Sequence, residues 1–200
     1  MSKMNLPNRL TSIRLLLVPV FIMIYLFDFR YFNIDVPVYD ILGTSLSLID
    51  ILAAIIFVSA AITDYFDGKL ARRKNLVTTF GKFIDPIADK LLVNSALILL
   101  TYFNRMSVIA LLIMILRDTF VDGIRLACVS KNVVLPASIY GKAKTMTQMI
   151  GITLLILNNP VFHYFKIPFA SIVIWIAAFI SALSGVDYFV KNKGYIMESM

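Results

Sequence analysis

Six apolar stretches, each long enough to cross a lipid bilayer as a helix, alternate with short polar segments along the chain. They span about residues Leu10–Phe29, Ser45–Tyr65, Phe83–Phe103, Val108–Val129, Ile139–Leu157 and Ile167–Val190. A helix needs roughly 20 apolar residues to span the hydrocarbon core of a bilayer. Turn-forming residues, such as Pro37 and the run Asn158-Asn159-Pro160, separate several of these stretches. The pattern therefore predicts six transmembrane helices joined by short loops.

A short polar segment, residues 5–11, precedes the first apolar stretch. Proline is favoured in the first turn of a helix, so we expect a helix to begin near Pro7 or Asn8, after a short interfacial segment. No small-residue cleavage site follows the first stretch, which is therefore interpreted as a retained helix and not as a signal peptide. A chain of 200 residues suits one compact bundle. We expect an all-α membrane protein with a single domain over residues 1–200.

Composition and charge support this interpretation and orient the helices. Hydrophobic residues make up 60% of the chain and charged residues 16%, whereas a soluble domain has about 25% charged residues. Sixteen Lys and Arg residues fall on the side of the two termini, and only Arg30, Arg105 and Lys166 fall on the other. The positive-inside rule then places the termini in the cytoplasm. The net charge of +7 is not arranged in a nucleic-acid-binding motif, so no nucleic-acid partner is expected. Trp175 and Tyr188, near helix ends, are predicted to be interface anchors.

Four aspartates are concentrated where the second apolar stretch ends and the third begins. Asp64 and Asp67 are three residues apart, and Asp85 and Asp89 are four residues apart. Residues at either spacing lie on one face of a helix. Because a short loop joins the two stretches, we expect antiparallel neighbouring helices. The four carboxylates can then converge at the cytoplasmic surface.

Four carboxylates gathered near lipid repel one another and lose hydration, which costs free energy. Divalent cations relieve that cost, and sites built from oxygen ligands suit Mg²⁺ or Mn²⁺. No His or Cys lies nearby in the sequence, so a zinc-selective site is not expected. The lone His163 is predicted to lie in a loop on the opposite side of the membrane. A single aspartate at a helix end is equally well explained as a solvated charge, but four at these spacings favour a metal site.

Small residues and an arginine follow Asp67. Gly68 has no Cβ, so a phosphate or nucleotide can approach the backbone closely there, and Ala71 extends this small surface. Arg72 offers a guanidinium that can hold a phosphate through two hydrogen bonds. The alternative is that the glycine aids helix packing and the charges are solvated. Beside the aspartates, these residues predict a site for a phosphate-bearing substrate.

A second group of charges lies in the fourth and fifth apolar stretches. Arg117 and Arg125 are eight residues, about two helical turns, apart and therefore share a face. Lys142 and Lys144 begin the fifth stretch on the same side of the membrane. Charges inside an apolar helix are costly and mark either a lined cavity or paired structural charges. The four bases predict a second phosphate site next to the aspartates. The alternative is internal pairing, as Arg117–Asp118 or Asp122–Arg125.

The aspartate-rich stretch resembles the signature of the CDP-alcohol phosphatidyltransferases. Residues 64–89 fill every fixed position of the pattern D-x2-D-G-x2-A-R-x8-G-x3-D-x3-D. Residues 6–14 are similar to the family's N-terminal P-N-x-L-T-x-x-R. Residues 81–90 resemble the G-K-F-L-D-P-L-A-D-K of its bacterial phosphatidylglycerophosphate synthases. Residues 117–125 and 141–145 resemble the R-E-F-x-x-x-G-x-R and G-K-x-K-T of those enzymes. The resemblance thus covers most of the chain.

The resemblance implies roles for these residues. Two divalent metal ions would be held by Asp64, Asp67, Asp85 and Asp89, and Asp89 would also act as the general base. The cytidine diphosphate would be bound by Asn8, Gly68, Ala71, Arg72 and Gly81. The acceptor phosphate would be bound by Arg117, Arg125, Lys142 and Lys144. Asp122 departs from the pattern, since a Thr is expected there. A carboxylate beside a phosphate is unfavourable unless it pairs with Arg125 or binds an acceptor hydroxyl.

The expected activity is transfer of the phosphatidyl group from CDP-diacylglycerol to sn-glycerol 3-phosphate, giving phosphatidylglycerophosphate and CMP. Because of Asp122, other acceptors remain open: phosphatidylglycerol, inositol phosphate or serine. A divalent-cation transporter is the alternative from another class, although transporters often place their sites near the bilayer midplane. The resemblance implies a multi-pass enzyme of the bacterial plasma membrane, surrounded by membrane lipid. Its active site would open to the cytoplasm, and its lipid-facing helices would permit a homodimer.

Overall fold

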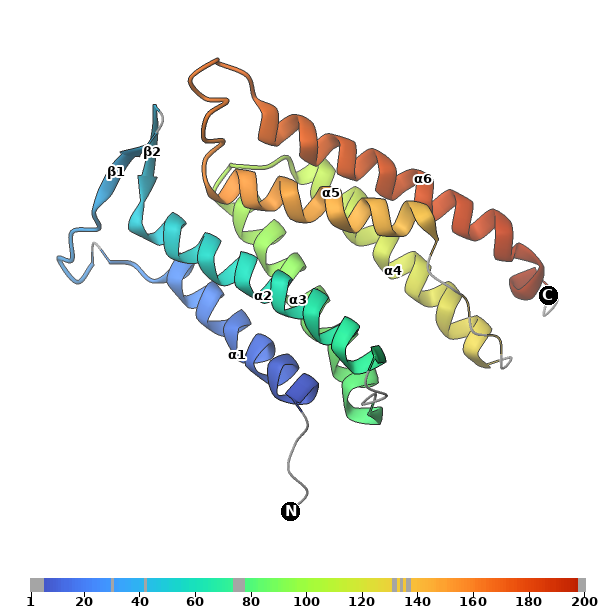
Figure 1. Cartoon of the computed structure of the whole chain (residues 1–200). Coiled ribbons are helices and arrows are strands. Elements are labelled where there is room, and N and C mark those ends of the chain that lie inside the picture. Colours follow the sequence, from blue (N-terminus) through green and yellow to red (C-terminus); the bar gives the residue numbers. More distant parts are fainter. Residues whose placement is uncertain are drawn as a thin grey trace.

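The computed structural model describes residues 6–29, 31–41, 43–73, 78–130, 133, 135 and 138–197, without the side chains of residues 6, 7, 65–73, 79, 80, 82, 130 and 195–197. Six helices form a bundle in this part of the chain (Figure 1). They are α1 (Leu6–Leu26), α2 (Leu48–Arg73), α3 (Thr79–Tyr102), α4 (Val108–Ser130), α5 (Ile139–Ile156) and α6 (Phe169–Met197). Each of the six predicted apolar stretches is largely helical, so a mostly helical fold is confirmed.

The helix boundaries differ from the predicted ones mainly at the starts of α1 and α3 and at the ends of α2 and α6. From Leu6 onward the N-terminal residues belong to α1, so the predicted interfacial segment is not separate from the helix there. Helix α2 continues from the apolar stretch through Arg73 and carries the first half of the aspartate motif. The side chain of Thr78 caps α3 by accepting a hydrogen bond of 3.0 Å from the Gly81 N–H. The motif therefore lies on two helices that extend beyond the apolar stretches.

A two-stranded antiparallel hairpin between α1 and α2 was not predicted. Strands β1 (Val38–Ile41) and β2 (Thr44–Ser47) pair with Ile41 opposite Thr44 and Val38 opposite Ser47. Gly43 in the connection has φ of +75°, a conformation that glycine adopts without a Cβ clash. The strands have four residues each, too short for a period-two pattern to stand out from a loop.

The bundle consists of two groups of three helices. Helix α1 packs against both α2 and α3, and α6 packs against both α4 and α5. Contacts between the groups are sparser and involve α2 and α3 on one side and α4 and α5 on the other. In Figure 1 the start of α1, the end of α2, the start of α3, the end of α4, the start of α5 and the end of α6 lie at the same end of the bundle. We call this the termini end.

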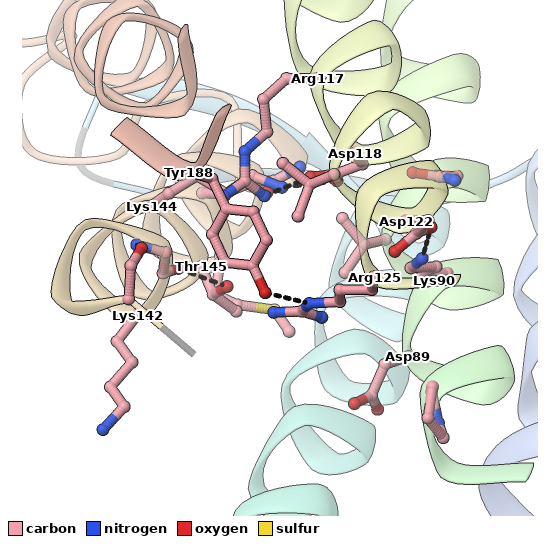
Figure 2. A pocket seen from close by; sticks show the side chains of 18 of the residues that line it. Asp89, Lys90, Arg117, Asp118, Asp122, Arg125, Lys142, Lys144, Thr145 and Tyr188 are labelled. Carbon is pink, nitrogen blue, oxygen red and sulfur yellow. Dashed lines mark hydrogen bonds and ion pairs between the residues drawn. The ribbon is translucent and has the colours of Figure 1, made fainter. Parts of the chain in front are cut away.

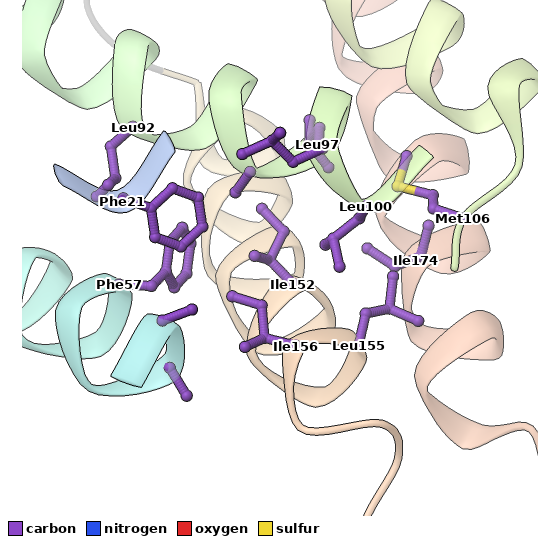
Figure 3. Close-up of a cluster of buried hydrophobic side chains, with 14 of the residues drawn as sticks. Phe21, Phe57, Leu92, Leu97, Leu100, Met106, Ile152, Leu155, Ile156 and Ile174 are labelled. Atoms are coloured by element: carbon purple, nitrogen blue, oxygen red, sulfur yellow. The ribbon is translucent and has the colours of Figure 1, made fainter. Parts of the chain in front are cut away.

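A cluster of buried hydrophobic side chains joins the two groups (Figure 3). Phe21 of α1 and Phe57 of α2 are fully buried there, with their ring centroids 6.2 Å apart. Leu97 of α3 and Ile152 of α5 complete the contact between the groups. Gly151 lets α5 approach α6 closely, because a Cβ at this position would lie 2.7 Å from Cδ1 of Ile174. The core therefore fixes how the two groups of helices face each other.

Two helices of the described part are long and apolar enough to cross a membrane on length and composition alone. They are residues Asn8–Leu26 of α1 and Phe169–Gly194 of α6. Helices α2, α3 and α4 each carry at least four charged residues, among them those of the aspartate motif. By this criterion α1 and α6 are candidate membrane spans.

Candidate active site

A cavity of about 310 Å³ lies between the two groups of helices and toward the termini end of the bundle. Helix α2 contributes Asp64 to its lining, and α3 contributes Asp89 and four neighbouring residues. Helices α4, α5 and α6 contribute most of the remaining wall. Figure 2 shows Asp89 on one side of the cavity and the basic side chains of α4 and α5 on the other. The four predicted acceptor-binding residues all border it: Arg117, Arg125, Lys142 and Lys144. The structure thus brings two of the motif aspartates and the basic cluster to one cavity.

Arg14 of α1 links the aspartates of α2 and α3. Its Nη1 donates to Oδ1 of Asp64 at 2.7 Å and to Oδ1 of Asp89 at 2.9 Å. Because both carboxylates accept from the same nitrogen atom, they lie next to each other. The Arg14 side chain is 1% exposed, while those of Asp64 and Asp89 are 38% and 39% exposed. A buried cation therefore holds two carboxylates whose outer sides remain accessible.

Asp85 lies beside this pair and is held by α1. The hydroxyl of Thr11 donates to Oδ1 of Asp85 at 2.6 Å. Asn8, one turn earlier on α1, accepts a hydrogen bond of 2.8 Å from the hydroxyl of Thr78 through Oδ1. A Cβ on Gly81 would lie 3.3 Å from this Asn8 oxygen and 3.7 Å from Oδ2 of Asp85. The small residue at position 81 thus lets α3 start close to the polar side chains of α1.

The remaining residues predicted to bind metal or the cytidine diphosphate have side chains that the structure does not describe. Residues 67, 68, 71 and 72 belong to the described backbone of α2, but their side chains do not belong to the described set. Among the described side chains, no three carboxylate, histidine or cysteine groups come together as a metal site. The four-aspartate metal site, Asp64, Asp67, Asp85 and Asp89, therefore stays a prediction.

The basic side of the cavity is organised around Asp118 of α4. Arg117 donates to its Oδ1 at 2.8 Å, and Lys144 of α5 donates to its Oδ2 at 2.6 Å. Arg117 also donates to the hydroxyl of Ser184 on α6 at 2.5 Å. One carboxylate between two cations leaves an excess of positive charge. The Arg117–Asp118 pairing considered as an alternative does form. Arg117 and Lys144, the two cations bound to Asp118, nevertheless both border the cavity.

Glycine provides the room that Arg117 needs beside α6. A Cβ on Gly185 would lie 3.0 Å from Cγ of Arg117, closer than side-chain carbons normally approach. The Nε atom of Arg117 is buried and has no hydrogen-bond partner among the described residues. A buried donor without a partner is unusual in a folded protein, which indicates that a ligand or water satisfies it.

The two remaining bases differ in their surroundings. Nε of Arg125 donates to the hydroxyl of Tyr188 at 3.1 Å, and the guanidinium carbon lies 5.5 Å from the centre of the Tyr188 ring. Tyr188 is 3% exposed, so it is a buried partner of Arg125 and not the interface anchor that was predicted. Lys142 is exposed, and Figure 2 shows its side chain extending away from Arg117 and Lys144. Trp175 is 45% exposed, as an anchor would be.

Asp122 has a partner that was not predicted. It forms an ion pair with Lys90 of α3, across the seam between the two groups of helices. The pairing with Arg125 considered from the sequence is wrong, since Arg125 points to Tyr188. Both members of the Lys90–Asp122 pair are about 40% exposed, as expected for a pair at the cavity mouth. Its charge is compensated by Lys90, so Asp122 does not conflict with an anion in the cavity.

An apolar groove of about 580 Å³ runs between α2 and α5 and ends at Asp64. Its walls include Phe57 and Ile62 of α2 and Met146 and Ile150 of α5. Asp64 is the only charged residue among those that line it, and Asp64 also borders the 310 Å³ cavity. The groove therefore connects an apolar helix surface with the polar cavity.

Comparison with known proteins gives consistent matches over most of the chain. The sequence profile of the CDP-alcohol phosphatidyltransferase family matches residues 4–183. A protein of Bacillus subtilis (strain 168) is 40% identical over 188 residues, 94% of this chain and 95% of its own length. A protein of Rickettsia bellii (strain RML369-C) is 38% identical over 192 residues, 96% of this chain and 97% of its own length. A protein of Wigglesworthia glossinidia brevipalpis is 35% identical over 191 residues, 94% of each chain. All three are named CDP-diacylglycerol–glycerol-3-phosphate 3-phosphatidyltransferase.

Proposed function

Because this chain belongs to the CDP-alcohol phosphatidyltransferase family, we propose that it transfers the phosphatidyl group of CDP-diacylglycerol to sn-glycerol 3-phosphate. The products are phosphatidylglycerophosphate and CMP. The observation that carries this proposal is that one cavity is bordered by Asp64 and Asp89 on one side and by four bases on the other. Two phosphate-bearing substrates that must meet need adjoining sites of this kind.

The donor set on the first side fits divalent metal ions. Asp64 and Asp89 lie next to each other around one guanidinium nitrogen and keep accessible oxygen atoms. The chain's single histidine, His163, lies in the loop between α5 and α6, and its single cysteine, Cys128, is buried. Hard oxygen ligands of this kind suit Mg²⁺ or Mn²⁺. We assign two such ions to Asp64, Asp67, Asp85 and Asp89; when bound, they would neutralise charge on the donor's diphosphate.

Residues at the start of α1, the end of α2 and the start of α3 complete the donor side. We propose that Asn8, Gly68, Ala71, Arg72 and Gly81 bind the cytidine diphosphate. The close approach of α1 and α3 at Gly81 supports this, since it places the Asn8 side chain beside Asp85. The apolar groove between α2 and α5 suits the acyl chains of the donor lipid, because it ends at Asp64. A lipid lying there would present its diphosphate to the aspartates.

The basic side of the cavity suits an anionic acceptor. Arg117 and Lys144 share one carboxylate, and Arg117 keeps a buried donor atom, Nε, without a partner among the described residues. Together with Arg125 and Lys142 they would hold the acceptor's phosphate. In the transfer, the acceptor's primary hydroxyl oxygen bonds to the phosphatidyl phosphorus as the bond from phosphorus to CMP breaks. Asp89 borders the cavity and accepts the hydroxyl proton.

Exposed apolar side chains support a membrane position for all six helices. Each helix has at least one large hydrophobic residue that is half or more exposed: Leu16, Ile55, Ile98, Leu116, Ile150 and Phe179. Exposed apolar surface of this extent is unfavourable in water and is typical of contact with lipid. We propose a multi-pass protein of the bacterial plasma membrane whose termini and cavity face the cytoplasm. The same surfaces would permit a homodimer, which light scattering of the detergent-purified protein tests.

The activity is tested by measuring CMP release by the purified protein in detergent. We expect release from CDP-diacylglycerol only when glycerol 3-phosphate and Mg²⁺ or Mn²⁺ are both present. Asp89→Asn should lower the turnover rate at least about a hundredfold, because a general base typically contributes two to four orders of magnitude. Asp187→Asn is the matched control, since Asp187 pairs with Lys191 on α6 and does not border the cavity.

Three results would contradict parts of this proposal. Absence of CMP release with glycerol 3-phosphate would remove the activity. Faster release with serine, inositol phosphate or phosphatidylglycerol would change the acceptor and leave the chemistry intact. An Asp89→Asn variant as active as the Asp187→Asn control would remove the proton-acceptor role of Asp89.

A further inference from the structure

Gln148 of α5 is a buried amide at the inner end of the cavity. It is the only glutamine in the sequence, is 2% exposed and belongs to the cavity lining. Its Nε2 atom is buried without a hydrogen-bond partner among the described residues. An unpaired buried amide is costly, and the cost is greater where no bulk water can reach. This amide therefore indicates a polar ligand that the protein is built to receive.

The position of Gln148 along α5 shows where that ligand would lie. The buried face of α5 runs from Lys144 through Gln148 to Ile152 in steps of one helical turn. Lys144 belongs to the basic wall of the cavity, and Ile152 belongs to the hydrophobic cluster. Gln148 is thus the deepest polar side chain on this face of α5. A neutral group there lies one turn beyond the cations that suit a phosphate.

The chemistry of an amide suits a hydroxyl group better than a phosphate. A side-chain amide has both donor and acceptor atoms, and a hydroxyl likewise both donates and accepts one hydrogen bond or more. A phosphate only accepts, and the neighbouring cations serve it better. An acceptor with a phosphate at one end and hydroxyls further along would place its phosphate at Lys144 and a hydroxyl at Gln148.

We propose that Gln148 binds the acceptor hydroxyl that does not react and so selects a polyol phosphate over acceptors that lack this hydroxyl. The inference rests on the proposed function, because it concerns the acceptor of the same reaction. In glycerol 3-phosphate this group is the middle hydroxyl, while the terminal hydroxyl attacks the donor. Gln148 is a specificity-determining residue in this assignment and takes no proton.

A pair of acceptors tests the assignment. 1,3-Propanediol monophosphate retains the phosphate and a primary hydroxyl but lacks the middle hydroxyl of glycerol 3-phosphate. For the wild-type protein we expect kcat/KM for CMP release to be roughly tenfold to a hundredfold lower with the propanediol compound, the effect of one lost hydrogen bond to a buried group. Gln148→Met keeps the side-chain length and removes the amide. It should lower kcat/KM with glycerol 3-phosphate by a similar factor and leave the propanediol compound nearly unaffected.

The matched control is Thr147→Val. Thr147 is the neighbouring residue on α5, donates to the carbonyl of Ala143 at 2.9 Å and does not line the cavity. Its variant should preserve the wild-type preference between the two acceptors. Equal use of both acceptors by the wild-type protein would overturn the assignment without any variant. Equal losses with both acceptors in Gln148→Met would overturn it too, since they would reflect structure or bound water. If the wild-type protein released no CMP with either acceptor, the proposed function would be wrong, and the role of Gln148 would be wrong with it.

Discussion

Arg14 connects one helix to carboxylates on two others, across 50 and 75 residues of sequence. The sequence contains a signal for it, since an arginine inside the first apolar stretch is a costly charge and marks a functional or paired site. The same signal cannot identify the partners, because hydrophobic periodicity says nothing about which distant helices meet. Arg14 was therefore recognised only as part of a motif, and its contact with Asp64 and Asp89 was missed.

Replacing Arg14 by glutamine is expected to destabilise the protein and impair catalysis together. The change leaves Asp64 and Asp89 facing each other without their cation, so the free energy of unfolding should fall by about 1–3 kcal/mol. Displaced carboxylates should lower CMP release about tenfold to a hundredfold. Thermal unfolding in detergent and the CMP assay measure the two effects.

Arg9→Gln is the matched control for this change. Arg9 is exposed on the same helix, and loss of its charge should alter stability by less than about 0.5 kcal/mol. If Arg14→Gln behaved like Arg9→Gln in both measurements, the contact of Arg14 with the aspartates would contribute neither to stability nor to catalysis.

At the scale of elements, the six helices could be predicted because each contains an apolar run of sufficient length. Their limits at the termini end of the bundle could not, since α2 continues into the polar run up to Arg73 and apolar content no longer marks the helix there. Spacing alone predicted that Arg117 and Arg125 share a face, and both border the cavity. The pairing of Asp122 with Lys90 could not be predicted, because Lys90 lies on another helix and the spacing within α4 carries no information about it.

Gly185→Ala tests whether the packing of α4 against α6 positions Arg117. The new Cβ would lie 3.0 Å from Cγ of Arg117, near the root of the side chain, where little adjustment is available. We expect a loss of about 1–3 kcal/mol in stability from overpacking, with a rise of several-fold in KM for glycerol 3-phosphate.

The comparison for this variant is Gly123→Ala on α4. No neighbouring side chain and no other segment of the described chain lies within 4 Å of a Cβ at Gly123, so alanine should raise stability by up to about 1 kcal/mol through its helix propensity. The unfolding temperature and the KM for glycerol 3-phosphate are measured for both variants, and the difference between them gives the effect of crowding Arg117. An unchanged KM in Gly185→Ala would separate Arg117 from acceptor binding.

For the whole molecule, the division into two groups of three helices could not be read from the sequence. Six apolar stretches of similar length permit several packing orders, and only contacts such as Gly151 with Ile174 select one. The sequence did predict that the termini and both charged clusters share one side. The directions of the described helices agree with that expectation. Successive helices run in opposite directions, so the start of α1 and the end of α6 lie at the same end of the bundle (Figure 1).

Cysteine labelling tests the orientation of the whole molecule in the membrane. His163→Cys lies in the loop between α5 and α6, and Lys193→Cys lies near the end of α6; both positions are exposed. A membrane-impermeant maleimide should label His163→Cys in intact cells and Lys193→Cys only after permeabilisation, because the positive charges hold the termini inside. The native Cys128 is 1% exposed and provides an unlabelled background. The reverse pattern would place the cavity outside the cell.

Continuity between the aspartate and basic walls of the cavity favours inhibitors that join two anions in one molecule. A compound carrying a cytidine diphosphate at one end and a tethered phosphate at the other could occupy both walls at once. Once its first end is bound, the second meets its wall at a high effective concentration, so a short tether should yield an affinity well beyond that of either half.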